Sequence, residues 1–286
     1  MLSALLDTFR LHANVYSTYQ FCGNWQVNAH EIGQTCFHMV TTGRCQMKME
    51  GHPPLILELG DLVVFPRELA HQLIPMDDEL VQVAHEPMEI IAPNESTPGT
   101  AILCGALIFE HTGFNHVLDA LPEVFVIQAK DAPWICPLLE QIRFEMNERP
   151  TGSKNIINRL SELLFVYALR HQIAINPHHS FLNLFVHKEL APALKSINQH
   201  PQQNWSIESL ANQCAMSRTK FSVLFKKVSG LTVNEYLTWW RMQLAWGYLK
   251  DGQRIAQVAD QVGYQSEAAF SRVFKKTYGI SPGKIL

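Results

Sequence analysis

The sequence contains no apolar run that approaches the roughly 18–20 residues needed for a membrane-spanning helix. Its first residues, Met1 to Asp7, carry an acid and lack the basic segment that begins a secretory signal peptide. These absences argue against a membrane protein and a secreted one, so we expect a cytoplasmic protein with no membrane partner. In that reducing compartment the six cysteines are more readily free thiols, metal ligands or redox sensors than structural disulfides.

Motifs of the common enzyme classes are also missing. The sequence has no glycine-rich nucleotide loop, no nucleophile motif and no pair of acids at a spacing typical of catalysis. We therefore expect that the protein is not an enzyme.

Charge is scarce and unevenly distributed. Charged residues make up 17% of the chain, and the formal net charge is −3. Residues 1–187 contain 10 Lys and Arg against 20 Asp and Glu, whereas residues 188–286 contain 13 against 6, a net charge of +7. A basic domain gains affinity for DNA by releasing counterions, so the C-terminal part is the candidate for DNA binding. The acidic part can be any solvated surface and says little about its ligand.

The stretch from Ile255 to Lys276 predicts a helix, a tight turn and a second helix. Apolar residues recur at helical spacing before Gly263, which can take the positive φ that ends a helix. Ser266 then serves as an N-cap, and Phe270 and Phe274 lie on the inner face of the second helix. With its basic outer surface, this pattern fits a helix-turn-helix motif and an ordinary helical hairpin equally well.

A looser copy at residues 209–232 favours the first interpretation. The turn of this copy is one residue shorter, and Val233 to Lys250 predicts a long helix connecting the two copies. A repeat of this size usually means one structural unit used twice. The matched positions are Ser217 with Ser266, Phe221 with Phe270, Phe225-Lys226-Lys227 with Phe274-Lys275-Lys276, and Gly230-Leu231-Thr232 with Gly279-Ile280-Ser281.

Residues 188–286 resemble the DNA-binding domain of the AraC/XylS family of bacterial transcription regulators. The most specific stretch is the second copy, from Ile255 to Pro282. After Ser-Pro the family usually continues with a Tyr-Arg pair, whereas this sequence has Gly283-Lys284-Ile285-Leu286. The resemblance implies an all-α domain with two helix-turn-helix motifs, which binds a promoter operator in double-stranded DNA and acts with RNA polymerase, for example as an activator.

By the same resemblance, outward positions near the start of each recognition helix contact bases, and the lysine pairs lie near phosphates. The implied DNA-binding residues are Arg218, Thr219, Ser222, Lys226, Lys227, Gln265, Glu267, Ala268, Arg272, Lys275 and Lys276.

Short apolar or alternating runs separated by turn residues dominate the first part of the chain and predict a β-sandwich or small barrel. Gly60 to Pro66, followed by His71, resembles the second half-motif of a cupin barrel, and the first half-motif is reduced to Phe37-His38. This resembles the cupin-type sensor domain of a subgroup of AraC-like regulators. The predicted strands are 37–40, 45–49, 55–59, 62–65, 80–83 and 101–109.

The predicted fold class is α+β. We expect a cupin-like sensor domain at 1–128, a helical pair at 129–176, a linker at 177–187 and the DNA-binding domain at 188–286. In the family that the chain resembles, an equivalent helical pair commonly mediates dimerisation, so a homodimer is expected. The alternative is that these helices only cover the barrel.

Two kinds of chemistry are open for the sensor domain. His38 and His71 occupy the places where a cupin barrel brings ligands inward, and with Cys22 they would complete a three-ligand zinc or iron site. Alternatively, Cys22 and Cys104 look similar in context to the cysteines of the reactive-chlorine-responsive branch of these regulators. Cys22 lies in the more polar setting and is the better first target of an oxidant.

The function that follows is a sequence-specific transcription regulator controlled by a small-molecule, metal or oxidant signal. The alternative is a metal-dependent cupin enzyme fused to a DNA-binding domain. The reduced first half-motif argues against that alternative.

Overall fold

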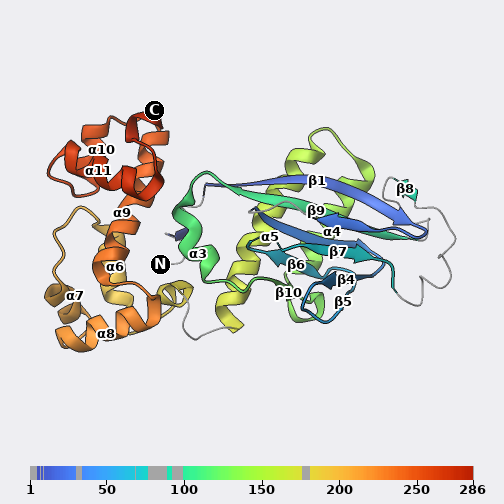
Figure 1. The fold of residues 1–286 in the computed structure, drawn as a ribbon, viewed down its shortest axis with the longest axis horizontal. Helices are drawn as coiled ribbons and strands as arrows, with labels where there is room; N and C mark the ends of the chain where they lie inside the picture. The colour runs from blue at the N-terminus through green and yellow to red at the C-terminus, as the bar shows by residue number, and fades with distance from the viewer. Residues whose placement is uncertain are drawn as a thin grey trace. The chain divides into compact units, whose positions relative to one another are not determined.

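The computed structural model describes residues 5–6, 8, 10–29, 34–67, 69–76, 89–91, 99–175 and 181–285. The chain forms two compact units (Figure 1). We call Leu11–Ile108 with Leu121–Gln172 the barrel unit, and Met1–Arg10, Phe109–Ala120 and Ile173–Leu286 the helical unit. None of the described helices combines the length and apolarity needed to cross a bilayer.

The barrel unit consists of two antiparallel sheets. One has the strand order β10-β6-β3-β9-β1-β8 and the other has the order β2-β7-β4-β5. The strands are β1 (Leu11–Cys22), β2 (Val27–Ala29), β3 (Thr35–Thr42), β4 (Cys45–Met49), β5 (Leu55–Leu57), β6 (Leu62–Phe65), β7 (His71–Ile74), β8 (Glu89–Ile91), β9 (Thr100–Phe109) and β10 (Phe125–Ile127). Five of the predicted strands are found, and the run at 80–83 lies outside the described residues.

Apolar side chains of both sheets form the core of the barrel unit. The core includes Trp25, Phe65 and three of the cysteines, Cys36, Cys45 and Cys104, each with at most 5% of its surface exposed. The burial of this apolar surface is the main force that holds the sheets together.

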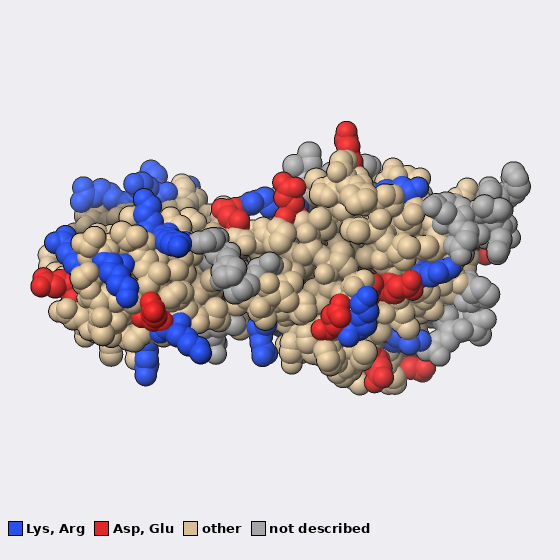
Figure 2. All heavy atoms as spheres, turned by 90° about the horizontal axis from the view of Figure 1, so that it is seen from below, with Lys and Arg blue, Asp and Glu red and all other residues tan. Residues whose placement is uncertain are grey.

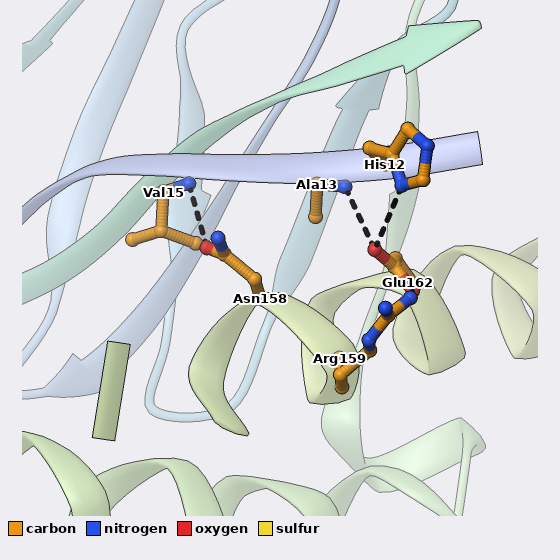
Figure 3. A network of polar contacts seen from close by, with 6 residues as sticks. All are labelled: His12, Ala13, Val15, Asn158, Arg159 and Glu162. Atoms are coloured by element: carbon orange, nitrogen blue, oxygen red, sulfur yellow. Dashed lines mark hydrogen bonds and ion pairs between the residues drawn. The ribbon is translucent and has the colours of Figure 1, made fainter. Parts of the chain in front are cut away.

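The helices α4 (Ile135–Glu148) and α5 (Ser153–Ile175) form the predicted helical pair, and α5 also protects a sheet edge. The backbone N–H of Ala13 donates to the Glu162 carboxylate at 3.2 Å, and that of Val15 donates to the Asn158 side-chain oxygen at 3.1 Å (Figure 3). Arg159 pairs with Glu162 at 2.8 Å. Side chains of α5 therefore take the place of a neighbouring strand along this part of β1, which prevents edge-to-edge pairing there.

The helical unit is built around α9 (Val233–Lys250), most of whose apolar residues are buried. Its C-terminal half packs against α10 (Ile255–Gln261) and α11 (Glu267–Tyr278), with Phe270 and Phe274 fully buried. The unit also contains α6 (Ala191–Gln199), α7 (Ile207–Gln213) and α8 (Arg218–Ser229).

The predicted linker at 177–187 is wrong for its second part. Residues Phe181–Phe185 form a 3-10 helix in which every side chain is buried, and Phe181 packs edge to face on Trp239 at 4.9 Å between ring centroids. Five consecutive residues with four apolar side chains are better buried than left in a solvated linker. The part at 177–180 lies outside the described residues.

A segment from the middle of the predicted barrel domain also belongs to the helical unit. Phe109–Ala120 forms a 3-10 turn at Thr112–Phe114 and the short helix α3 (Asn115–Asp119). The Trp239 indole nitrogen donates to the Gly113 carbonyl at 2.7 Å, and the His111 ring lies 4.7 Å from the Trp246 ring and 5.2 Å from the Tyr278 ring. The compact units therefore do not follow the predicted boundary at 128, since the chain enters the helical unit at 109 and leaves it at 120.

Candidate nucleic-acid interface

The first helix-turn-helix motif consists of α7 and α8. Ser206 and Ser209 form a reciprocal capping box at the start of α7. The turn that follows contains Ala215 in the left-handed region, at φ 52°. Ser217 then caps α8 by accepting a hydrogen bond from the Lys220 N–H at 3.3 Å.

The second motif, α10 and α11, repeats this geometry with one additional residue. Gly263 takes the left-handed conformation at φ 82°, in the place of Ala215. The Tyr264 N–H donates to the Ala259 carbonyl, as that of Met216 does to Ala211. Gln265 is the additional residue, and Ser266 caps α11 by accepting from the Ala269 N–H at 3.2 Å.

The two recognition helices, α8 and α11, have the same length and equivalent residues at their N-caps and C-caps. Each has 12 residues and ends at a left-handed glycine, Gly230 at φ 75° and Gly279 at φ 74°. Each also ends with two lysines in its last turn, where a positive charge is favoured by the helix dipole. From the N-caps onward, each residue of α8 corresponds to the residue of α11 that lies 49 positions later.

The predicted DNA-binding residues lie on the outer faces of these two helices, except Gln265, which lies in the turn before α11. Ser222 is half-buried and all the others are exposed. On the helical unit, the face seen in Figure 2 carries mainly Lys and Arg with few acids. The side chains of the predicted set offer hydrogen-bond donors, acceptors and positive charge, as a surface that contacts DNA requires. The exposed set is Arg218, Thr219, Lys226, Lys227, Gln265, Glu267, Ala268, Arg272, Lys275 and Lys276.

Two exposed residues of α8, Lys220 and Val223, are missing from the predicted set. Val223 has 63% of its surface exposed, and the 49-residue shift makes it the counterpart of Arg272. It lies on the border of a hollow of about 440 Å³, together with Ser222, Lys226 and Lys227. The repeat places Val223 on the outer face of α8, at the position equivalent to that of Arg272 in α11. A valine carries neither charge nor hydrogen-bonding groups, so its side chain gives no sign of DNA binding in the sequence.

A second candidate site lies inside the barrel unit, where His38 and His71 meet. Their Nε2 atoms are 2.7 Å apart, and both residues are almost fully buried. The His71 Nδ1 lies 2.6 Å from the Leu69 carbonyl, which can only accept, so this nitrogen carries the proton. When both rings are neutral, the His38 Nε2–H donates to the His71 Nε2.

The remaining nitrogen of His38, Nδ1, is buried without a hydrogen-bond partner among the described residues. Burial, together with the neighbouring His71, lowers the pKa of His38 to about 3. His38 is therefore neutral at physiological pH.

The two predicted redox cysteines lie in different surroundings. Cys104, on β9, is 1% exposed and stands opposite His38 in the β3–β9 pairing. Cys22 is half-buried, and burial together with the nearby Glu89 raises the pKa of its thiol. A raised pKa reduces the thiolate fraction of Cys22, but Cys22 is the more exposed of the two thiols, so its role as the first target of an oxidant stays a prediction.

The predicted three-ligand metal site is not assembled in the described part of the chain. No three His, Cys, Asp or Glu side chains there come close enough together to hold a metal ion. The structure brings His38 and His71 together, and Cys22 does not complete a cluster with them.

Comparison with known proteins agrees with this two-part organisation. A family profile described as Cupin matches residues 1–174, and one described as Helix-turn-helix domain matches residues 210–286. An HTH-type transcriptional regulator of Haemophilus influenzae is 31% identical over 292 residues, which cover 99% of this chain and 97% of that protein. The regulator AlkR of Acinetobacter baylyi is 28% identical, with 98% and 97% covered. RclR of Escherichia coli, named as an RCS-specific transcriptional activator, is 27% identical, with 91% and 88% covered.

Proposed function

This chain belongs to the AraC-type transcription regulators with an N-terminal cupin domain, and from this membership we propose how it binds DNA and how a signal reaches it. The curated relatives are HTH-type transcriptional regulators, so the chain is a DNA-binding regulator and the enzyme alternative is set aside.

The matched pair of recognition helices is the observation that carries the DNA-binding mechanism. Each motif presents its second helix, so α8 and α11 enter successive major grooves on one face of the duplex. Residues near the start of each helix contact base edges, and the lysines of the last turns lie near phosphates. The base-contacting set is Arg218, Thr219 and Ser222 in α8, Gln265 in the turn before α11, and Glu267, Ala268 and Arg272 in α11. The phosphate-contacting set is Lys226, Lys227, Lys275 and Lys276.

Replacement of Arg272 tests this mechanism. The full-length protein would first be given random duplexes, and its preferred site would be recovered by repeated selection and then measured by gel shift. Arg272→Ala is expected to weaken that site by about 1–3 kcal/mol and to relax the sequence preference in one half of it. If the variant binds the selected site as the wild type does, Arg272 does not contact bases.

For the signal, we propose oxidation of a thiol in the barrel unit. The chemistry of the core supports this, because Cys104 is packed among apolar side chains and a sulfenic acid there would place a polar group in an apolar environment. The name of RclR as an RCS-specific activator points to the same class of signal. Strand β9 continues from Cys104 directly into the segment Phe109–Ala120, so the chain itself provides a path from this thiol to the helical unit.

The test is to treat the wild type, Cys22→Ser and Cys104→Ser with hypochlorous acid and to compare their binding to the selected site. A response in the wild type that is lost in Cys104→Ser supports the proposal. Equal responses in all three proteins would exclude both cysteines as the trigger, and the absence of a response in the wild type would favour a small organic effector.

The predicted zinc or iron fits the barrel unit poorly. The two histidines supply two donors, their facing nitrogens are already bonded to each other, and Cys22 does not join them. We therefore derive no step that involves a metal.

We further propose that the regulator works in the cytoplasm as a homodimer that acts with RNA polymerase. The dimer is supported by apolar side chains of α5 at spacings of four, three and four residues, which is the pattern of a helix–helix seam. Ile156 and Leu163 on this seam are 42% and 40% exposed, and Phe144 of α4 is 53% exposed. The seam consists of Ile156, Leu160, Leu163 and Tyr167.

A further inference from the structure

The two recognition helices share a backbone plan but differ at one outward position. Val223 of α8 and Arg272 of α11 are equivalent by their distance from the N-caps Ser217 and Ser266. The equivalence is supported by the fully buried phenylalanines, Phe221 and Phe225 in one helix and Phe270 and Phe274 in the other. Both helices therefore present this position at the same place on their outer surface.

Val223 borders a hollow that is lined by the apolar side chains of Ile207 and Val233 and by polar ones, and its neighbours along the outer face of α8 are polar. Thr219 and Lys227 lie four residues away on either side, one turn along the same face, and Thr219 and Lys227 are both exposed. Packing in the core does not explain a valine at this position, since 63% of its surface is exposed. Helix propensity does not explain it either, because a β-branched residue is a mediocre helix former. The position is thus an exposed apolar contact point, of about one isopropyl group, between the polar side chains of Thr219 and Lys227.

In the major groove, the thymine 5-methyl group is the apolar feature that such a side chain can recognise. Arginine at the equivalent position of the other helix is suited instead to the O6 and N7 acceptors of guanine. From the exposed Val223 and its equivalence to Arg272 we infer that Val223 determines specificity for thymine in the half-site bound by α8. This inference rests on the proposed binding of α8 in a major groove.

The mechanism is direct contact between methyl groups. The Val223 methyls and the thymine methyl exclude water from each other, and the nearby Lys226 and Lys227 are placed to neutralise flanking phosphates. The half-site of α8 therefore has a required T·A pair where the half-site of α11 has a required G·C pair.

Substitution of thymine by deoxyuridine tests this contact, because it removes the methyl group and leaves the pairing edge intact. The selected site would be synthesised with each thymine replaced in turn, and the full-length wild type, Val223→Ala and Arg272→Ala would be compared by gel shift. The half-site of α11 is recognised as the half in which Arg272→Ala relaxes the preference. In the other half, one replacement is expected to weaken wild-type binding about fourfold, corresponding to one buried methyl group.

Val223→Ala should be insensitive to that replacement, whereas Arg272→Ala should remain as sensitive as the wild type. A Val223→Ala protein that keeps the full sensitivity would overturn the assignment, and so would a wild type for which no thymine methyl in this half matters. Val223→Arg should change the preferred base at the same position from thymine to guanine, and an unchanged preference would also count against the assignment. A wild type that enriches no sequence at all would instead refute the proposed function and this inference with it.

Discussion

The indole nitrogen of Trp239 donates a hydrogen bond of 2.7 Å to the backbone carbonyl of Gly113, which lies 126 residues earlier in the chain. Trp239 is 5% exposed, so this bond satisfies a polar group that could not reach water. Together with the ring contacts of His111, it fixes the segment Phe109–Ala120 against α9 and α11.

Gly113→Ala should destabilise the helical unit. A Cβ atom at this position would collide with the Gln243 side chain and would lie 2.7 Å from the His111 Nδ1. The expected loss is about 1–3 kcal/mol in the free energy of unfolding, measured by urea titration with tryptophan fluorescence. Gly247→Ala, within α9, is the matched control, because its Cβ would meet only Arg10 at an ordinary 3.6 Å. That change should stabilise by about 0.5–1 kcal/mol.

The stability of the helical unit should fall in mild acid because of His111. Burial lowers the pKa of His111 to about 4, the neighbouring Glu110 opposes this shift and Arg10 adds to it. In the unfolded chain His111 therefore binds a proton below a pH of about 6.5. In the folded state His111 binds this proton only near pH 4. Stability is fully present above pH 6.5 and is lost as the pH falls towards 4, by about 2 kcal/mol at pH 5.

The measurement compares the wild type and His111→Gln in urea at pH 7.5 and pH 5.0. The variant should lose less stability between these two values than the wild type. Identical losses would show that His111 is not held neutral.

The turn of the first helix-turn-helix motif contains strain that the second one lacks. The backbone of Ala215 lies in the left-handed region, where a residue other than glycine costs about 1 kcal/mol. Ala215→Gly should therefore raise the melting temperature of the protein. Gly263→Ala should lower it, since its Cβ would lie 2.7 Å from the Gln202 carbonyl. The opposite signs are the result to look for in a thermal scan.

Removal of a single lysine should weaken binding to all DNA sequences alike. Lys276→Ala deletes one positive charge from the last turn of α11. The slope of log K against log salt concentration should become less steep by about 0.9 if one phosphate contact is lost. Lys130→Ala removes an equally exposed lysine from the barrel unit and should leave the slope unchanged.

A charge in the seam of α5 should dissociate the proposed dimer. Leu163→Glu places a carboxylate where a second copy would bury an apolar side chain, at a cost of about 3 kcal/mol, or roughly 100-fold in affinity. Sedimentation at micromolar concentration would show the shift from dimer to monomer. Lys154→Glu, at the exposed first turn of the same helix, should sediment as the wild type does. A wild type that is monomeric throughout would contradict the dimer itself.

The helix-turn-helix motifs could be predicted from the sequence because their determinants are local. A serine N-cap, a glycine able to take positive φ and two phenylalanines four residues apart fix each recognition helix within a dozen residues. The strands of the barrel unit followed in the same way from short apolar runs between turns. The pairing of His38 with His71 could be expected only because the cupin resemblance placed both residues inside a barrel.

The placement of Phe109–Ala120 could not be predicted because nothing in that stretch has a helical or strand period that points to α9. From the sequence, its partners Trp239 and Trp246 could be predicted only to be buried residues of a long helix. The same holds for the β1 edge, where Asn158 and Glu162 look like ordinary polar positions of an amphipathic helix. Contacts over such distances in sequence depend on the tertiary arrangement and leave no local pattern.

The route of the chain through the helical unit limits how such a regulator can be modified by recombination. A chimera that joined a foreign sensor to residues 181–286 would contain both recognition helices but would lack the carbonyl acceptor for Trp239 and the ring that covers Trp246. Its α9 would expose indole surface and aggregate more readily. A functional exchange of the DNA-binding part must therefore transfer the twelve residues from 109 to 120 along with the C-terminal part.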